Sequence, residues 1–201
     1  MSSPTENAQD FAKLYGHFPP VYRPHDFAER GARSKWRTAM QKSLPALYLP
    51  AGLELREGSH YQPPRFDFGW KLTTEEVTSI CQQQGLRAAD FVGSDPARLP
   101  AQTTLNNNLK LSHPDAPSIR IDTILAGEAT PSICITLTDN HRAGNARPFT
   151  RSIQAVKGFL GLEEAREPGW YLDSRWSHWQ WQSSDGFKLT NSGRTSQEGG
   201  W

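Results

Sequence analysis

Apolar and polar residues follow two different periods between residues 66 and 181. Alternation at every second position predicts four strands, at residues 66–72, 118–125, 132–138 and 170–181. A spacing of three to four residues predicts two helices, at residues 73–85 and 150–160. The resulting order, strand, helix, strand, strand, helix, strand, predicts a ferredoxin-like βαββαβ sandwich of the α+β class. In that fold an antiparallel sheet of strand order 4-1-3-2 carries both helices on one face.

The helix at residues 73–85 has the clearest boundaries. Thr73 and Glu76 have the spacing of a capping box, and Gly85 is placed to end the helix in a left-handed conformation. In the hairpin of residues 118–138, the apolar residues that should share the inner face are Ile119, Ile121, Ile133, Ile135 and Leu137. The connection of residues 86–117 contains four prolines and has the least regular pattern, and its length leaves three alternatives open: a functional loop, an ordered excursion or a disordered insertion.

Proline and polar content divide the chain into three parts. Residues 1–64 contain eight prolines and predict an N-terminal arm with one amphipathic helix, at residues 28–42. Residues 65–190 form the α+β core domain, and residues 191–201 form a polar, glycine-rich tail. The helix of the arm places Trp36 on one side and Arg30, Arg33 and Arg37 on the other.

Composition excludes several classes of protein. The chain has 201 residues and a formal net charge of +1, which argues against a globally basic nucleic-acid binder. Its two cysteines lie far apart, and neither metal-ligand spacing nor a cofactor-binding motif is present, so we expect no metal and no cofactor. No signal peptide or membrane-spanning run is visible, which leads us to expect a cytoplasmic or nuclear protein without a membrane partner.

Strand parity gathers a set of polar side chains on the helix-free face of the predicted sheet. Charged pairs from neighbouring strands, Arg120 and Asp122 among them, could converge there into a pocket for an anion or for an acid and a base. The alternative is a solvated sheet face with cross-strand ion pairs, or a face that the N-terminal arm covers. The set consists of Asp67, Lys71, Arg120, Asp122, Cys134, Thr136, Thr138, Tyr171, Asp173 and Arg175.

The loop of residues 139–147 provides the sharpest catalytic hypothesis. His141 could act as a general acid or base, with Arg142 and Arg147 holding an oxyanion, a phosphate or another small anionic ligand near a helix N-terminus. The alternative is a polar turn in which Asp139 and Asn140 form local caps.

The final strand carries four of the seven tryptophans, Trp170, Trp176, Trp179 and Trp181. Clustered tryptophans are typical of protein interfaces and ligand pockets, and the alternative is a core closed by large side chains.

The leading interpretation is a non-catalytic binding or assembly module that uses this strand and the arm to contact another protein or a second copy of the chain. A small cofactor-independent enzyme is the alternative. Nucleic-acid binding through the helix of residues 28–42 is a further alternative, which the near-neutral charge disfavours.

Overall fold

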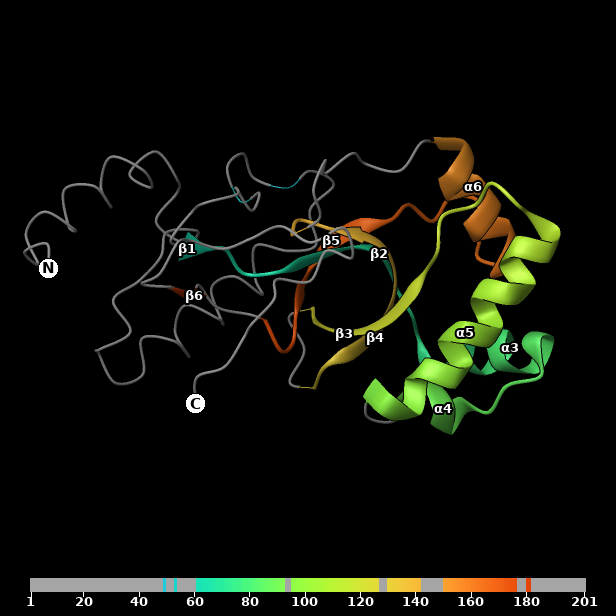
Figure 1. Ribbon diagram of the computed structural model, residues 1–201. Coiled ribbons are helices and arrows are strands. Elements are labelled where there is room, and N and C mark those ends of the chain that lie inside the picture. Colours follow the sequence, from blue (N-terminus) through green and yellow to red (C-terminus); the bar gives the residue numbers. More distant parts are fainter. Residues whose placement is uncertain are drawn as a thin grey trace, which may run out of the picture.

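The computed structural model describes residues 49, 53, 61–92, 95–126, 130–141, 150–176 and 180–181. Both strands and helices occur in this part of the chain (Figure 1). The strands are β1 (Tyr61–Gln62), β2 (Phe66–Lys71), β3 (Arg120–Leu125), β4 (Ser132–Asp139), β5 (Gly169–Asp173) and β6 (Gln180–Trp181). The helices are α3 (Thr74–Gln84), α4 (Ala88–Val92), α5 (Asp95–Ser112) and α6 (Thr150–Phe159).

The four longer strands form a closed barrel in the order β2-β4-β3-β5. The prediction of an open ferredoxin-like sandwich is therefore wrong. Three of the strand pairs, β5 with β2, β2 with β4 and β4 with β3, are those of a 4-1-3-2 sheet. A fourth pair joins the two edges of that sheet, because Ile124 and Leu125 of β3 pair with Asp173 and Leu172 of β5. This pairing removes both edge strands and turns the polar face inward.

An irregularity in the β2–β4 pair accounts for part of the curvature that closure requires. The register shifts between Phe68 and Gly69, so that Phe68 pairs with Thr138 and Gly69 with Thr136. Such bulges bend a strand pair and increase its twist. The backbones also approach closely here, since a Cβ atom on Gly69 would lie 1.9 Å from the carbonyl oxygen of Ile135. Only glycine fits this position without moving β4.

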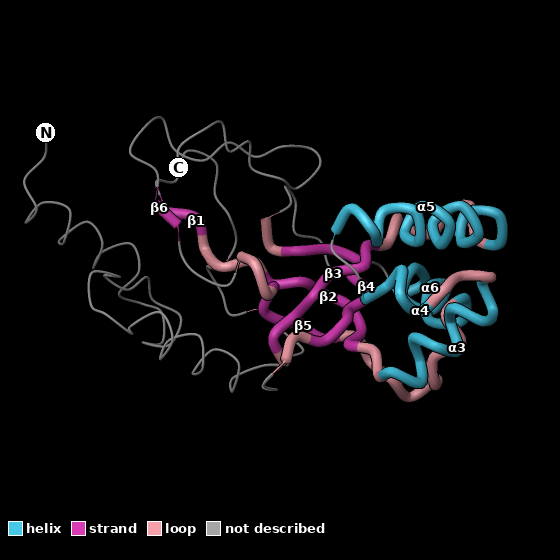
Figure 2. The backbone as a smooth tube through the Cα atoms, turned by 90° about the horizontal axis from the view of Figure 1, so that it is seen from below, coloured by secondary structure: helices cyan, strands magenta, loops and turns pink. Residues whose placement is uncertain are grey.

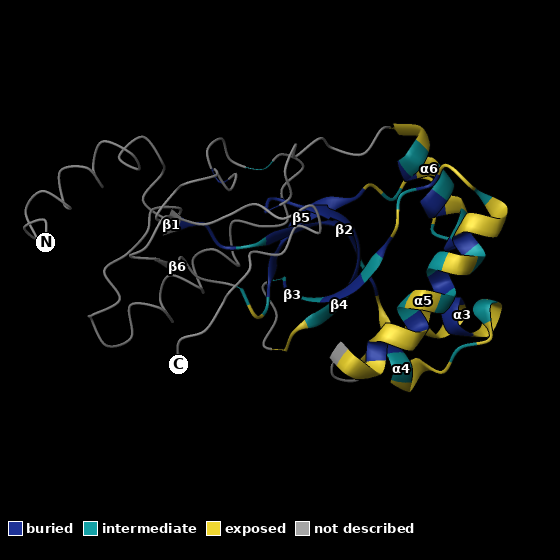
Figure 3. Ribbon diagram, viewed as in Figure 1, coloured by how far each residue is buried: buried dark blue, intermediate teal, exposed yellow. Residues whose placement is uncertain are grey.

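The apolar side chains of the barrel pack against helices gathered at one end of the molecule (Figures 2 and 3). Phe66, Phe68 and Trp70 of β2 are fully buried, and the ring centroids of Phe68 and Trp170 lie 5.1 Å apart. The expected inner face of the hairpin is confirmed. Its four most buried members, Ile119, Ile121, Ile135 and Leu137, belong to this core, and Ile133 packs against it.

The predicted caps of helix α3 are confirmed. The Glu76 amide donates to the Thr73 hydroxyl at 3.2 Å, and the Glu76 carboxylate accepts from the Thr73 amide at 2.7 Å. Gly85 ends the helix with φ of 67°. Helix α6 likewise occupies the predicted segment, with Ile153 and Val156 buried.

Of the three alternatives for residues 86–117, the structure shows an ordered excursion, because α4 and the 18-residue α5 lie there. Pro96 is tolerated in the first turn of α5, where the missing amide has no intrahelical partner, whereas Pro100 lies inside the helix and removes one i→i−4 hydrogen bond. Ala101, Leu105 and Leu109 are all buried at a spacing of four residues. This periodicity was visible in the sequence and outweighs the prolines.

None of the described helices is long and apolar enough to cross a membrane.

The predicted final strand is interrupted. Strand β5 ends at Asp173, whose side chain accepts hydrogen bonds from the amides of Arg175 and Trp176 at 2.7 and 3.0 Å and so forms a local turn. The chain then pairs with β1 through β6, in a separate two-stranded ladder. Residues 177–179 of the predicted final strand, the helix of residues 28–42 and the tail of residues 191–201 lie outside the described residues.

Candidate functional site

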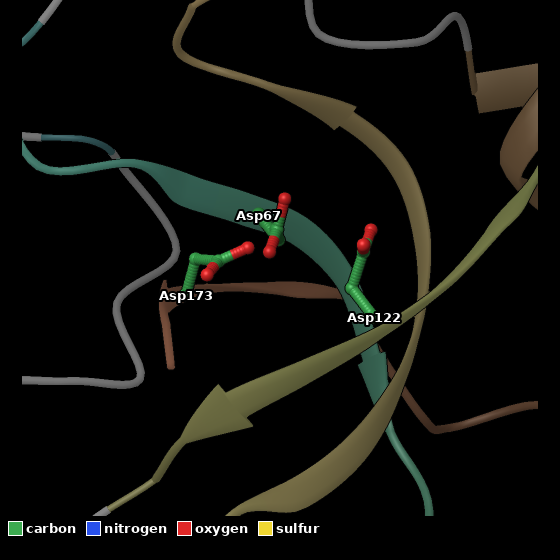
Figure 4. A group of neighbouring side chains, drawn as sticks. All are labelled: Asp67, Asp122 and Asp173. Atoms are coloured by element: carbon green, nitrogen blue, oxygen red, sulfur yellow. The ribbon is translucent and has the colours of Figure 1, made fainter. Parts of the chain in front are cut away.

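Each strand of the barrel contributes one buried aspartate to a single cluster. Asp67 belongs to β2, Asp122 to β3, Asp139 to β4 and Asp173 to β5. Their exposed fractions are 0%, 5%, 1% and 0%, respectively. Figure 4 shows Asp67, Asp122 and Asp173 reaching toward one another from their three strands. Each of the three offers an oxygen that lies within 4.8 Å of the others.

Two arginines hold the carboxylates together. Nη2 of Arg65, immediately before β2, lies 3.1 Å from Asp67, 3.5 Å from Asp122 and 3.7 Å from Asp139, and its Nε lies 3.8 Å from Asp173. Arg120 of β3 contacts Asp67, Asp122 and Asp139 at 3.1, 3.0 and 2.9 Å. Arg65 therefore connects all four strands through a single guanidinium.

Two further arginines act on the cluster from its edge. Nη2 of Arg175 lies 3.4 Å from Asp122 Oδ1 and 3.8 Å from Asp173 Oδ2, and its side chain is 39% exposed. Burial lowers the pKa of Arg98 in α5, and the charges of Asp122 and Asp173 partly restore it. Among the described ion pairs of these aspartates, those of Arg175 involve the most exposed arginine, and its shortest contact of 3.4 Å is longer than the shortest contacts of Arg65 and Arg120, at 3.1 and 2.9 Å.

The two oxygens of Asp67, and likewise those of Asp173, have different surroundings. Asp67 Oδ1 accepts from Arg65 and Arg120, each at 3.1 Å, while Asp173 Oδ1 accepts from the amides of Arg175 and Trp176. Among the described residues, no hydrogen-bond donor reaches Oδ2 of either aspartate. A buried carboxylate oxygen without a donor is costly, and such atoms commonly mark a position for a proton, a water molecule or an ion.

Burial and charge act differently on the acids of the cluster. Burial raises the pKa of Asp67 well above its usual value, and it also raises the pKa of Asp173. At Asp122 burial acts in the same direction, but Arg120 and Arg65 outweigh it and lower the pKa. Asp122 is therefore the firmly ionised member, while Asp67 and Asp173 are the members most ready to accept a proton or a cation.

The structure brings together five residues of the predicted polar face, Asp67, Arg120, Asp122, Asp173 and Arg175. Cys134 and Thr136 are buried on the same face, and burial raises the pKa of the Cys134 thiol. Thr138 leaves this face, because the irregularity in β4 pairs it with Phe68 and places Asp139 opposite Asp67 instead. Sequence reasoning missed Asp139, which it assigned to a loop, and Arg65, which precedes the strand pattern.

The predicted catalytic His141 lies outside the cluster in a closed network of hydrogen bonds. Its Nε2 donates to the Pro63 carbonyl at 2.7 Å, and its Nδ1 accepts from Gln62 Nε2 at 3.1 Å. Burial lowers the pKa of His141 to about 4, so the imidazole is neutral at physiological pH. Beside it, Asn140 donates to the carbonyls of Leu53 and Pro64 and accepts from the Phe66 amide. Arg142 and Arg147 lie outside the described residues.

The predicted tryptophan surface is divided. Trp170 is buried in the core, and Trp176 is half-buried at the turn after β5. Trp179 lies outside the described residues, and for Trp181 only the backbone pairing with Tyr61 is described. Arg30, Arg33 and Arg37 of the predicted basic helix also lie outside them.

Comparison with known proteins adds no assignment, since no family model matches the chain and no curated protein or solved structure matches it significantly.

Proposed function

We propose that the protein is a non-catalytic binding or assembly module that contacts a protein partner through the surface around Trp176 and β6, with a second copy of the chain as the first partner to test. The observation that carries the proposal is the departure of β6 from the barrel. After the turn at Asp173 the chain pairs with β1, on the side of the barrel away from the helices (Figures 1 and 2).

The form of this ladder supports a role in contacts between chains. Strands β1 and β6 contain two residues each, and a two-stranded ladder is only marginally stable by itself in water. Strand edges readily gain hydrogen bonds from another chain, and exposed tryptophan and arginine side chains are enriched at protein interfaces. Arg175 and Trp176 lie next to this ladder in the sequence, and both keep part of their surface accessible.

The placement of the acid–base candidates favours binding over catalysis. Both ring nitrogens of His141 are engaged by neighbouring groups, and its side chain is buried. The carboxylates of Asp67 and Asp173 are fully buried, so an organic substrate cannot touch them in this conformation. The alternative enzyme at residues 139–147 therefore gains no support from the described geometry.

Light scattering on a dilution series of the full-length chain tests the proposal. We expect a concentration-dependent dimer or larger species, and we expect Trp176→Ala to shift association to higher concentration. The barrel should stay folded in this variant, because the Trp176 carbonyl that accepts from the Arg65 amide at 2.8 Å is retained.

Leu111→Ala is the matched control, since Leu111 is a large apolar residue that is 84% exposed on α5. It should associate as the wild type does. A wild-type chain that stays monomeric at every concentration would contradict self-association. Equal association of the wild type and Trp176→Ala would exclude the surface around Trp176 as the contact.

A further inference from the structure

We propose that Asp67, Asp122 and Asp173 form a binding site for a hard divalent cation, with Ca²⁺ as the best fit, and that the cation competes with the guanidinium of Arg175. This inference is independent of the proposed function. The sequence predicted no metal site, because the ligands come from three strands and have no recognisable spacing along the chain.

The donor atoms of the site are carboxylate oxygens, which suit a hard cation. The three carboxylates are buried, and each provides an oxygen within 4.8 Å of the other two. Ca²⁺ takes about 6–8 oxygens at about 2.3–2.6 Å in a flexible geometry, whereas Mg²⁺ demands near-ideal octahedral geometry and keeps several waters, so carboxylates from three separate strands suit Ca²⁺ better. A site made only of carboxylate oxygens also favours hard cations over Zn²⁺ or Cu²⁺.

Two buried carboxylate oxygens of the site, Oδ2 of Asp67 and Oδ2 of Asp173, lack a hydrogen-bond donor among the described residues. Asp67 is fully buried, and no donor among the described residues reaches its Oδ2, while Oδ1 takes both arginine contacts. Asp173 repeats this division, with Oδ1 bonded to two amides and Oδ2 without a hydrogen-bond donor. Both carboxylates are thus held by Oδ1, while Oδ2 of Asp67 accepts no hydrogen bond from the described residues and Oδ2 of Asp173 has only ion-pair contacts of 3.8 Å there, to Arg65 and Arg175, which a cation could replace.

Charge explains why Arg175 is the competitor. Among the described ion pairs, the Arg175 guanidinium contacts Asp122 and Asp173, which are two of the three proposed ligands. A divalent ion bound to these two carboxylates would repel the guanidinium, so the two cations should exclude each other. Arg175 is better placed to withdraw than Arg65 or Arg120, since its side chain is 39% exposed and its shortest described contact to the cluster is 3.4 Å. Arg65 and Arg120 are only 11% and 17% exposed.

Calorimetric titration of metal-stripped, full-length protein with CaCl₂ tests the site, with thermal unfolding as a second readout. We expect saturable binding with one ion per chain and a rise in Tm with Ca²⁺ concentration. Arg175→Gln should bind Ca²⁺ about tenfold more tightly, because a competing positive charge is removed. Asp173→Asn should bind at least about tenfold more weakly, because a charged ligand is lost.

Asp115→Asn is the control, since Asp115 is an exposed acid outside the cluster, and it should bind as the wild type does. The absence of saturable Ca²⁺, Mn²⁺ or Mg²⁺ binding in both the wild type and Arg175→Gln would overturn the proposal. Binding that Arg175→Gln leaves unchanged would overturn the competition. If Asp173→Asn fails to fold, Arg175→Gln still decides the question, because Arg175 lies at the edge of the cluster.

Discussion

Titration of His141 should leave a measurable mark on the stability of the protein. Burial lowers its pKa from 6.5 to about 4, so the folded protein disfavours the charged imidazole while the unfolded chain takes up a proton near pH 6.5. Stability from this group is therefore complete above pH 6.5 and is lost as the pH falls toward 4. The loss amounts to about 3 kcal/mol, on the basis of the shift from 6.5 to about 4.

Urea unfolding between pH 7 and pH 4 measures this effect, with His141→Gln as the comparison. We expect the variant to be less stable at pH 7 but to lose less stability on acidification. Asp67 and Asp173 act in the opposite direction, because their raised pKa values favour the folded state as the pH falls. The difference between wild type and variant isolates the histidine. Parallel pH profiles for the two proteins would show that His141 does not titrate on unfolding.

At the scale of the elements, two glycines with opposite surroundings form a matched pair of tests. A Cβ on Gly69 would meet the Ile135 carbonyl oxygen at 1.9 Å, whereas a Cβ on Gly158 in α6 would meet nothing within 4 Å. Gly69→Ala should lower the free energy of unfolding by at least about 3 kcal/mol, because β2 and β4 must separate. Gly158→Ala should raise it by about 0.5–1 kcal/mol through helix propensity.

Thermal or urea denaturation checks both substitutions. A Gly69→Ala variant as stable as the wild type would show that the close approach of β2 and β4 is not required for closure of the barrel. The test on Gly158 serves as the control that an added methyl group is harmless where space exists.

At the scale of the whole molecule, Arg65 is the group on which the integrity of the barrel depends most. Its guanidinium contacts one carboxylate from each of the four strands. Arg65→Met would leave four buried acids with fewer positive partners, and removal of one partner from a buried ion pair typically costs about 3–5 kcal/mol. We expect a loss of that size in the free energy of unfolding measured in urea.

Arg87→Met is the control for this test. Arg87 forms an exposed pair with Asp90 in α4 at 2.8 Å, and surface pairs of this kind have little effect on stability. It should unfold as the wild type does. An Arg65→Met variant with equal stability would indicate that protonation of Asp67 and Asp173 compensates for the missing charge.

Features that depend on neighbours along the chain can be predicted from the amino-acid sequence alone. The caps of α3 at Thr73 and Gly85, the hairpin of β3 and β4 and the helix α6 follow from local periodicity and capping chemistry. Strand parity also placed Asp67, Arg120, Asp122 and Asp173 on one face, because side chains alternate in any strand. The same periodicity could have predicted helix α5, since Ala101, Leu105 and Leu109 have helical spacing.

Closure of the sheet, in contrast, depends on contacts between segments that are distant along the chain. Pairing of β3 with β5 joins residues about fifty positions apart, and nothing local to Ile124 or Asp173 specifies it. The irregularity in β4 exchanges Thr138 for Asp139 on the polar face, and a one-residue change of register cannot be seen in an alternating pattern. Closure converts a face that would be solvated into a buried cluster. Burial thereby raises the pKa of Asp67 and Asp173. It also leaves Oδ2 of each without a hydrogen-bond donor among the described residues, and a proton or a cation could occupy these positions.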